Sequence, residues 1–591
     1  MQSKSLALAL RWGGATAIAG AALAAGIVTA LSEIPTLEIS PDYDPHAKIF
    51  AESSYPTAAT CGECHTQIYK EWSNSSHAYA SISPMFHKFE QIINDLSSGT
   101  ARAFCVRCHQ EVGTQRGEPR AAALWERSEV AREGVTCITC HRITEEYAKV
   151  NGQRTVQPGT ISRPVTSSGN GSKFYEILKH REDYHITTSE KEHGSQIHVG
   201  VVKFPQISQP QFCVSCHQVA VQPGIKLEVV WDQYRASPAA AQGVTCQDCH
   251  MGRVPGINAG YTRAPSAVVG GKEINPQRIH HNHGFYGPGY SIAHPGLFPQ
   301  NPKSLQTKIE DWLKFNWRAG WGEEDFEDKV ESGKVKVSFP KVWSDSTDRE
   351  DARDIIKENL EGIAQKRSLR VQVMENGSRV DGPFFSSPPA LGSSLNFTYR
   401  ITNTNPGHNM PSGSLGAQPE IWVDVGLIGP DGKRLWESGY VDSYGDMADL
   451  HSFDVRAGTI AVDDQLVNLQ TKFLTTNVVG TDREMYLPVN FDIDQLPFIR
   501  PNGVPQTVLN HPPFIRMEQR SIPPLGFRDA VYSVPGDLLK VPGTYKLAFR
   551  MRSRAEPIYF MKFVKATTEM LQSMNLGMID IHPYTVAFEV K

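Results

Sequence analysis

The sequence lacks several features that would point to common classes of protein. All ten cysteines fall inside five short motifs, so none is left over for a separate disulfide or metal site. The chain has no basic run, and its formal net charge is only −4. It also contains no recognition motif for nucleic acid. These absences argue against a nucleic-acid partner and direct attention to the cysteine motifs.

The five cysteine motifs share one pattern, Cys-x-x-Cys-His, which is the attachment signature of c-type haem. Two thiols placed three residues apart on one turn can each bond a haem vinyl group, and the histidine that follows supplies an axial imidazole to the iron. One copy would also fit a redox dithiol or half of a zinc site. Five complete copies make these alternatives remote, so the sequence predicts five covalently bound haem c groups, each with its iron.

The motifs name the residues that would carry these groups. The cysteines predicted to attach haem are Cys61, Cys64, Cys105, Cys108, Cys137, Cys140, Cys213, Cys216, Cys246 and Cys249. The histidines predicted to be proximal iron ligands are His65, His109, His141, His217 and His250.

Four of the motifs form a duplicated pair. The letters FCVxCHQ around Cys105 recur around Cys213, and GVTC at Cys137 recurs at Cys246. The two members are separated by 32 residues in the first copy and by 33 in the second. A duplicated pair implies a repeated haem–haem packing geometry, which a conducting chain requires.

The N-terminus and the haem chemistry both place the protein outside the cytoplasm. Covalent haem attachment takes place there, where unpaired thiols would otherwise be liable to form disulfides. Lys4 and Arg11 precede the uncharged run Trp12–Leu31, whose length of about 20 residues matches a spanning helix. This pattern predicts a membrane anchor that holds the chain on the periplasmic side of the cytoplasmic membrane. The alternative is a cleaved signal sequence and an exported protein, with Val28–Ala30 as the cleavage site.

Composition and periodicity divide the remainder. Long Gly-, Pro- and Ser-rich loops are expected where haem supplies the core. Helical spacing follows the motifs, and from about residue 369 the hydrophobic residues alternate, as in Leu395, Phe397, Tyr399 and Ile401. Ile421–Ile428 leads through a Gly-Pro-Asp-Gly turn into Arg434–Trp436, a hairpin signal. The predicted parts are 1–31 (anchor or signal sequence), 32–55 (linker), 56–302 (pentahaem cytochrome c domain), 303–368 (helical connector) and 369–591 (β-sandwich domain).

The predicted fold class is therefore multidomain. It combines an N-terminal transmembrane helix, a mostly α and irregular multihaem cytochrome c domain, and an all-β C-terminal sandwich of immunoglobulin-like type.

The sixth position of each iron decides between electron transfer and ligand binding, because a closed iron passes electrons and an open one can bind a small molecule. The chain has 20 histidines, five of them in the motifs, and this surplus indicates distal ligation. The distal candidates are His77, His193 from the group His185, His193 and His198, His283 from the group His280, His281, His283 and His294, and His408 in the turn Gly407–Gly413. His87 and His451 are weaker alternatives, and Met410 is a thioether substitute for His408.

These residues also carry a family resemblance. CGECH followed by WSNSSH, two GVTCxxCH motifs, FCxxCHQ, and GHNMPSG followed by GPDGKRLWESG resemble the multihaem cytochromes of the cytochrome c-554-like family that bear a C-terminal β-domain. The resemblance covers most of the chain after residue 55. It implies electron transfer through closely packed haems, mostly held by two histidines, and implies that His77, His283 and His408 are ligands. Some relatives keep one five-coordinate haem.

The sequence thus predicts a membrane-anchored, periplasmic electron-transfer protein. Its partners would be redox proteins: a membrane or dehydrogenase donor and a downstream acceptor. The alternative is a multihaem reductase whose single open haem acts on a small nitrogen or sulfur species. The surplus of histidine and the lack of a Cys-x-x-Cys-Lys motif favour electron transfer, and no catalytic residue is assigned.

Overall fold

A computed structural model describes residues 55–96, 99, 103–147, 151–189, 191–221, 225–413, 419–475, 485–486, 515–518 and 520–591. Trp12–Leu31, on which the predicted transmembrane helix rests, lies outside these residues. No helix in the described ranges is long and apolar enough to cross a membrane. The longest of them, α18 (Ser346–Asn376), has the length but carries charged residues along it. The predicted fold class is therefore wrong in its transmembrane helix. The described fold consists of a cytochrome-like region and a β-rich C-terminal region.

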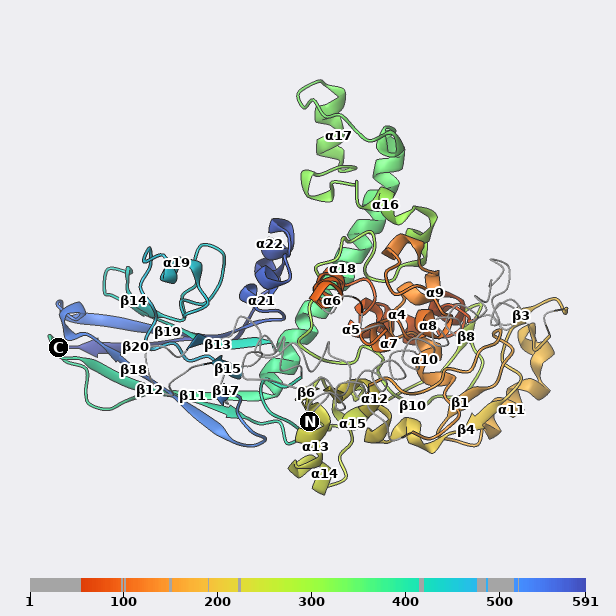
Figure 1. Ribbon diagram of the computed structural model, residues 1–591, viewed down its shortest axis with the longest axis horizontal. Coiled ribbons are helices and arrows are strands. Elements are labelled where there is room, and N and C mark those ends of the chain that lie inside the picture. The colour runs from red at the N-terminus through yellow and green to blue at the C-terminus, as the bar shows by residue number, and fades with distance from the viewer. Residues whose placement is uncertain are drawn as a thin grey trace, which may run out of the picture. The chain divides into compact units, whose positions relative to one another are not determined.

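Short helices and long loops make up the motif region, defined here as residues 55–301 (Figure 1). Its α-helices are α3 (Ala58–Gly62), α4 (Thr66–Ser73), α5 (Ser76–Tyr79), α6 (Pro84–Leu96), α7 (Val106–His109), α8 (Glu111–Gln115), α9 (Glu129–Arg132), α10 (Cys137–His141), α11 (Ser172–Lys179), α12 (Val214–His217), α13 (Val230–Arg235), α14 (Pro238–Ala241) and α15 (Cys246–His250). Its described strands form two-stranded sheets: β1 (Val165–Ser167) with β4 (Val201–Lys203), β2 (Ile186–Thr187) with β3 (Ser195–Gln196), β5 (Val219–Val221) with β6 (Ile225–Glu228), β7 (Thr262–Ala264) with β10 (Arg278–His280), and β8 (Val268–Val269) with β9 (Lys272–Glu273).

Hydroxyl side chains start several of these short helices. Thr57 caps α3, Ser75 caps α5 and Ser237 caps α14, and each accepts a hydrogen bond from a backbone N–H in the first turn. A capping hydroxyl satisfies a donor that the helix itself leaves unpaired, and its loss costs about 0.5–2 kcal/mol. The chain can therefore begin a new helix every few residues and turn repeatedly around the motifs.

A helical segment joins the motif region to the β-rich region. It contains α16 (Ile309–Trp312), α17 (Glu324–Glu331) and α18, the long green helix of Figure 1. Ala352 and Ile356 of α18 pack into a cluster of aromatic side chains made by Trp312, Phe315, Trp321 and Trp343. At the other end of α18, Met374 belongs to the core of the β-rich region. One helix therefore reaches both hydrophobic clusters.

Two antiparallel sheets form the body of the β-rich region, residues 378–591. The first has the strand order β11 (Ser378–Phe385), β12 (Leu395–Asn403), β18 (Phe527–Val534). The second has the order β14 (Arg434–Ser438), β13 (Glu420–Ile428), β19 (Gly543–Arg554), β20 (Ile579–Val590). A third small sheet has the order β16 (Met485–Tyr486), β15 (Lys472–Thr475), β17 (Ile515–Glu518). The short helices are α19 (Phe453–Arg456), α21 (Ile558–Phe563) and α22 (Thr568–Leu576).

Side chains from both large sheets share one core. On β12 the alternating residues Leu395, Phe397, Tyr399 and Ile401 are each at most 2% exposed, and they pack with the inward residues of β13, β18 and β19. Burying a large apolar side chain contributes about 1.5–3 kcal/mol. The predicted alternation is confirmed, and so is the predicted hairpin, because β13 pairs antiparallel with β14.

Candidate haem-binding cavity

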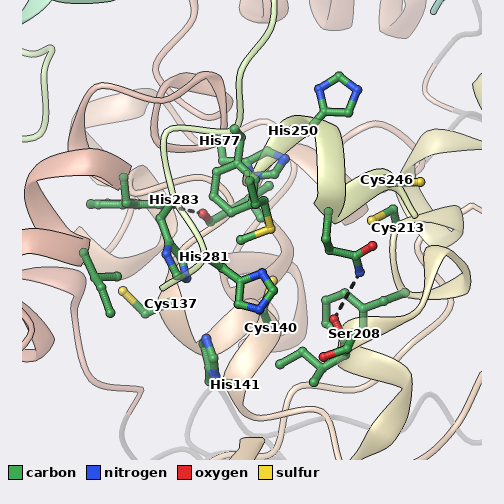
Figure 2. A pocket seen from close by; sticks show the side chains of 18 of the residues that line it. His77, Cys137, Cys140, His141, Ser208, Cys213, Cys246, His250, His281 and His283 are labelled. Atoms are coloured by element: carbon green, nitrogen blue, oxygen red, sulfur yellow. Dashed lines mark hydrogen bonds between the residues drawn. The ribbon is translucent and has the colours of Figure 1, made fainter. Parts of the chain in front are cut away.

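Four of the five cysteine motifs line one continuous cavity of about 1730 Å³. The residues around it include the cysteines and histidines of the first, third, fourth and fifth motifs. Figure 2 shows part of this wall, with Cys137, Cys140, His141, Cys213, Cys246 and His250 around the space. A pocket for one small molecule has a volume of about 300–1,000 Å³, so this cavity is large enough for several bound groups.

The repeated letters GVTC form the same turn in both copies. Gly134 and Gly243 each adopt a left-handed backbone with φ of 71°, which glycine tolerates without strain. The threonine two residues later begins the motif helix: Thr136 is the N-cap of α10 and Thr245 is the N-cap of α15. The first cysteine of the motif is then the first helical residue, so the turn fixes the direction in which the cysteines and the histidine project.

Four motif histidines each face a second histidine across the cavity. The ring centroids are 6.4 Å apart for His65 and His198, 6.4 Å for His141 and His283, 6.3 Å for His217 and His77, and 6.1 Å for His250 and His408. A metal ion held by two imidazole nitrogens at about 2 Å each places the two ring centres roughly 6 Å apart. The four pairs therefore have the spacing of histidines that share one axially bound iron.

All of these histidines are held in the neutral form. Desolvation lowers the pKa of His77, His198 and His283 to about 3, and lowers that of His217 and His408 to about 4. It also lowers the pKa of His65, His141 and His250. A neutral imidazole keeps a lone pair on one ring nitrogen, which is the form that binds a metal. The residues of the cavity thus fit a haem iron in both position and protonation.

Backbone carbonyl oxygens orient most of the motif histidines. The Nδ1 atom lies 2.5 Å from the Ser266 oxygen in His65, 3.1 Å from the Thr166 oxygen in His141, and 2.6 Å from the Tyr286 oxygen in His250. A hydrogen bond from Nδ1 to a carbonyl fixes the tautomer and leaves Nε2 free for the metal. His217 departs from this pattern, because it makes no such bond to any residue that the structure describes.

The second motif has a different environment. Its histidine, His109, stacks on Phe86 with the ring centroids 4.2 Å apart, and no second histidine faces it among the described residues. His87, the weaker candidate beside Phe86, places its Nε2 atom 2.7 Å from the Ser81 carbonyl oxygen. The His109 Nδ1 atom lies 3.1 Å from the Ala80 carbonyl oxygen, as expected for a proximal ligand. Among the described residues, the second motif thus has a histidine oriented like those of the other motifs and no imidazole opposite it.

Neighbouring motifs meet at their cysteines. The thiols of Cys61 and Cys137 lie side by side, as do those of Cys213 and Cys246, and those of Cys108 and Cys216. Figure 2 shows Cys213 and Cys246 next to one another. These contacts make the fourth motif a neighbour of both the second and the fifth, and the first motif a neighbour of the third.

The structure brings together three of the four distal candidates that the sequence suggests. His77, His283 and His408 each face a motif histidine. His193 does not: it is exposed in a loop, and His198 instead faces His65. Of the histidines before the fourth motif, the structure thus places His198, and not His193, opposite a motif histidine. The distance in sequence from the motif does not distinguish His193 from His198, because the short β2–β3 pair and a turn decide which of the two side chains points inward.

The Cys-x-x-Cys-His motifs and the paired histidines define the class of protein as a multihaem c-type cytochrome. The family model for cytochrome c554 and c-prime matches residues 60–142, which hold the first three motifs. Over these residues the chain is similar to the cytochrome c554 family, as its sequence resemblance implied.

Two solved structures resemble the chain more distantly. A penta-heme cytochrome c552 from Thermochromatium tepidum is similar at 14% identity with a TM-score of 0.46, covering 90% of this chain and 99% of that one. The Pseudomonas fluorescens alkylpurine DNA glycosylase AlkC bound to DNA is similar at 9% identity with a TM-score of 0.13, covering 48% and 67%. No curated protein matches this sequence.

Proposed function

We propose that this cytochrome conducts electrons through haems fixed at the first, third, fourth and fifth motifs, each iron held between two histidines. The four histidine pairs with centroid spacings of 6.1–6.4 Å carry the proposal. When bound, haem supplies an iron that changes its charge by one electron. The motif cysteines would fix each ring, and the carbonyls of Ser266, Thr166 and Tyr286 would hold three proximal imidazoles in place.

The contacts between cysteines suggest an order for the path. Haems whose attachment thiols lie side by side have neighbouring edges. The first motif would thus pass electrons to the third, and the fourth to the fifth, while Cys140 lies near Cys216 and so connects the third motif to the fourth. The second motif would join at the fourth through Cys108 and Cys216. The fourth haem would therefore be the junction of the path.

The partners of such a path would be redox proteins outside the cytoplasm. One would be a dehydrogenase or another electron donor, and the other a downstream acceptor. The five motifs support a total of five haems. Besides the four haems of the path, one would be held at the second motif by Cys105, Cys108 and His109.

The second motif supports a second candidate function. A haem there would have His109 as its proximal ligand and no imidazole on the other side, so its iron would keep one position open. An open iron binds small ligands, and a chain of closed haems could then supply electrons to it. The second candidate is a reductase of a small nitrogen or sulfur species at this haem.

Low-temperature electron paramagnetic resonance of the oxidised, full-length protein tests both functions, combined with haem counting by mass. We expect five haems, four low-spin signals and one high-spin signal that changes when nitrite, sulfite or cyanide is added. Five low-spin signals would contradict the reductase and leave electron transfer intact. A protein whose mass equals that of the bare polypeptide would contradict both.

A further inference from the structure

The histidine pair of the fourth motif differs from the other three pairs in its hydrogen bonds. Among the described residues, the buried Nδ1 atom of His77 has no hydrogen-bond partner, and no hydrogen bond joins the His217 ring to a backbone carbonyl. In each other pair at least one ring has such a partner, through His65, His141 or His250. An acceptor at Nδ1 makes the imidazole a stronger donor to the metal and so stabilises the oxidised iron. A haem between His217 and His77 is without this stabilisation and would be easier to reduce.

A half-buried lysine lies beside the same pair. Lys366 projects from α18, and its Nζ atom donates a hydrogen bond of 3.0 Å to the hydroxyl of Ser76, the residue before His77. Among the described residues no carboxylate forms an ion pair with Lys366. Arg370, one turn further along α18, is buried and donates to the carbonyl oxygens of Pro288 and Gly577.

The other charged groups near His77 are already paired. Arg154 lies close to His77, but Glu111 binds its guanidinium at 2.8 Å. Glu71 shares a cavity of about 270 Å³ with Lys70 and Lys366, yet its carboxylate binds His280 at 2.8 Å and the backbone of His283 at 2.9 Å. Lys366 is thus the basic group near His77 that no described acid pairs with, and desolvation lowers its pKa to about 7, so a nearby acidic group would favour its charged form. A buried charge without a partner is costly, so this site is suited to an acidic group of a bound haem.

We propose that Lys366 is a positioning residue that raises the reduction potential of the haem held by His77 and His217 above the potentials of the other bis-histidine haems. This inference rests on the proposed electron-transfer function, because it requires a haem at the fourth motif. Electrons entering from the second, third or fifth motif would then collect at the junction of the path.

The sign follows from electrostatics. Oxidised haem carries one more positive charge than reduced haem, so a nearby cation favours the reduced form. Removing the cation lowers the potential. If Lys366 binds a haem propionate, its loss also uncovers a negative charge, and that effect has the same sign. We expect the ratio of oxidised to reduced haem to change about tenfold, which for one electron corresponds to a shift of about 59 mV.

The test is a spectroelectrochemical titration of the full-length holoprotein and its Lys366→Met variant. One haem should titrate at a lower potential by about 59 mV, while the others keep their midpoints. Lys366→Arg should restore the potential because it keeps the charge. The matched control is Lys357→Met on the same helix, where the lysine is exposed and 3.4 Å from Asp354, and it should shift no midpoint.

A second variant identifies the haem. In His77→Ala the fourth haem becomes high-spin, and adding Lys366→Met should shift the midpoint of that high-spin component. The inference is overturned if no midpoint moves, if all midpoints move together, or if the shifted haem keeps its low-spin signal in the His77→Ala background. Haem counts by mass on the same samples distinguish a failure of the Lys366 inference from a failure of the proposed function. A fourth motif without haem would contradict the proposed function itself.

Discussion

The motif region and the β-rich region are stabilised in different ways. In the β-rich region the inward side chains of two sheets fill one core, where Phe397, Tyr399 and Leu547 are fully buried. In the motif region the walls are short helices and loops around a cavity of about 1730 Å³. The first region can be held together by its own side chains. The second has the architecture of a shell that closes around bound groups, and this difference can be tested.

Loss of one haem should have the largest effect, and it should be confined to the motif region. We expect the double variant Cys213→Ala, Cys216→Ala to lack one haem and to be cut rapidly by protease within residues 55–301, because the wall of the cavity loses its contents. The β-rich region should resist the same protease. Limited proteolysis with mass analysis of the fragments measures this. The variant Asp431→Ala, in an exposed turn, is the control, and equal cleavage of both regions would contradict the comparison.

A cavity in the β-rich core should have the converse effect. Phe397→Ala should lower the free energy of unfolding of this region by about 3–5 kcal/mol, because it removes a buried aromatic ring. The haem absorption spectrum should stay unchanged. Thermal unfolding followed by circular dichroism gives the first quantity and visible absorption the second. Val531→Ala on the same sheet is the matched control, since Val531 is 65% exposed and should change little.

His408 is the point at which the β-rich region contributes to the cavity. It lies between β12 and β13 and faces His250. His408→Ala should convert one low-spin haem into a high-spin haem, while the unfolding of the β-rich core changes little. Electron paramagnetic resonance measures the spin state. His451→Ala is the control, because His451 stacks on Tyr559 at 4.0 Å and faces no motif histidine in the described residues. An unchanged low-spin spectrum in His408→Ala would exclude this ligand.

The smallest expected effect concerns pH. Desolvation, with a contribution from Glu420, raises the pKa of Glu556 to about 8, against about 4.3 in an unfolded chain. The folded protein therefore binds this proton more tightly, and the associated stability is full below about pH 4.3 and is lost as the pH rises through 8. Glu556→Gln should raise the melting temperature at pH 8 and flatten its decline between pH 5 and 8. The exposed Glu569→Gln should leave the decline as it is in the unaltered protein.

Sequence patterns predicted the two regions unequally. The alternation of Leu395, Phe397 and Tyr399 predicted β12 because strand periodicity and burial are both local properties. The Cys-x-x-Cys-His motifs likewise predicted a site, and four of them line one cavity. The distal histidines were harder to predict, because each lies far along the chain from the motif histidine that it faces and meets it only in the folded protein. His198 instead of His193 faces His65, and nothing in the sequence of the second motif indicated that no described histidine would face His109.

One feature of the duplicated motifs limits how far the two copies are interchangeable. Gly134 and Gly243 have the same φ and are followed by the same residues, Val-Thr-Cys. A methyl group on Gly134 would nevertheless lie 2.5 Å from the carbonyl oxygen of His77, whereas one on Gly243 would meet nothing within 4 Å. A substitution at Gly134 would thus push on a histidine that belongs to another motif's pair. The same residue in the two copies of the duplicated pair therefore tolerates substitution to a different degree.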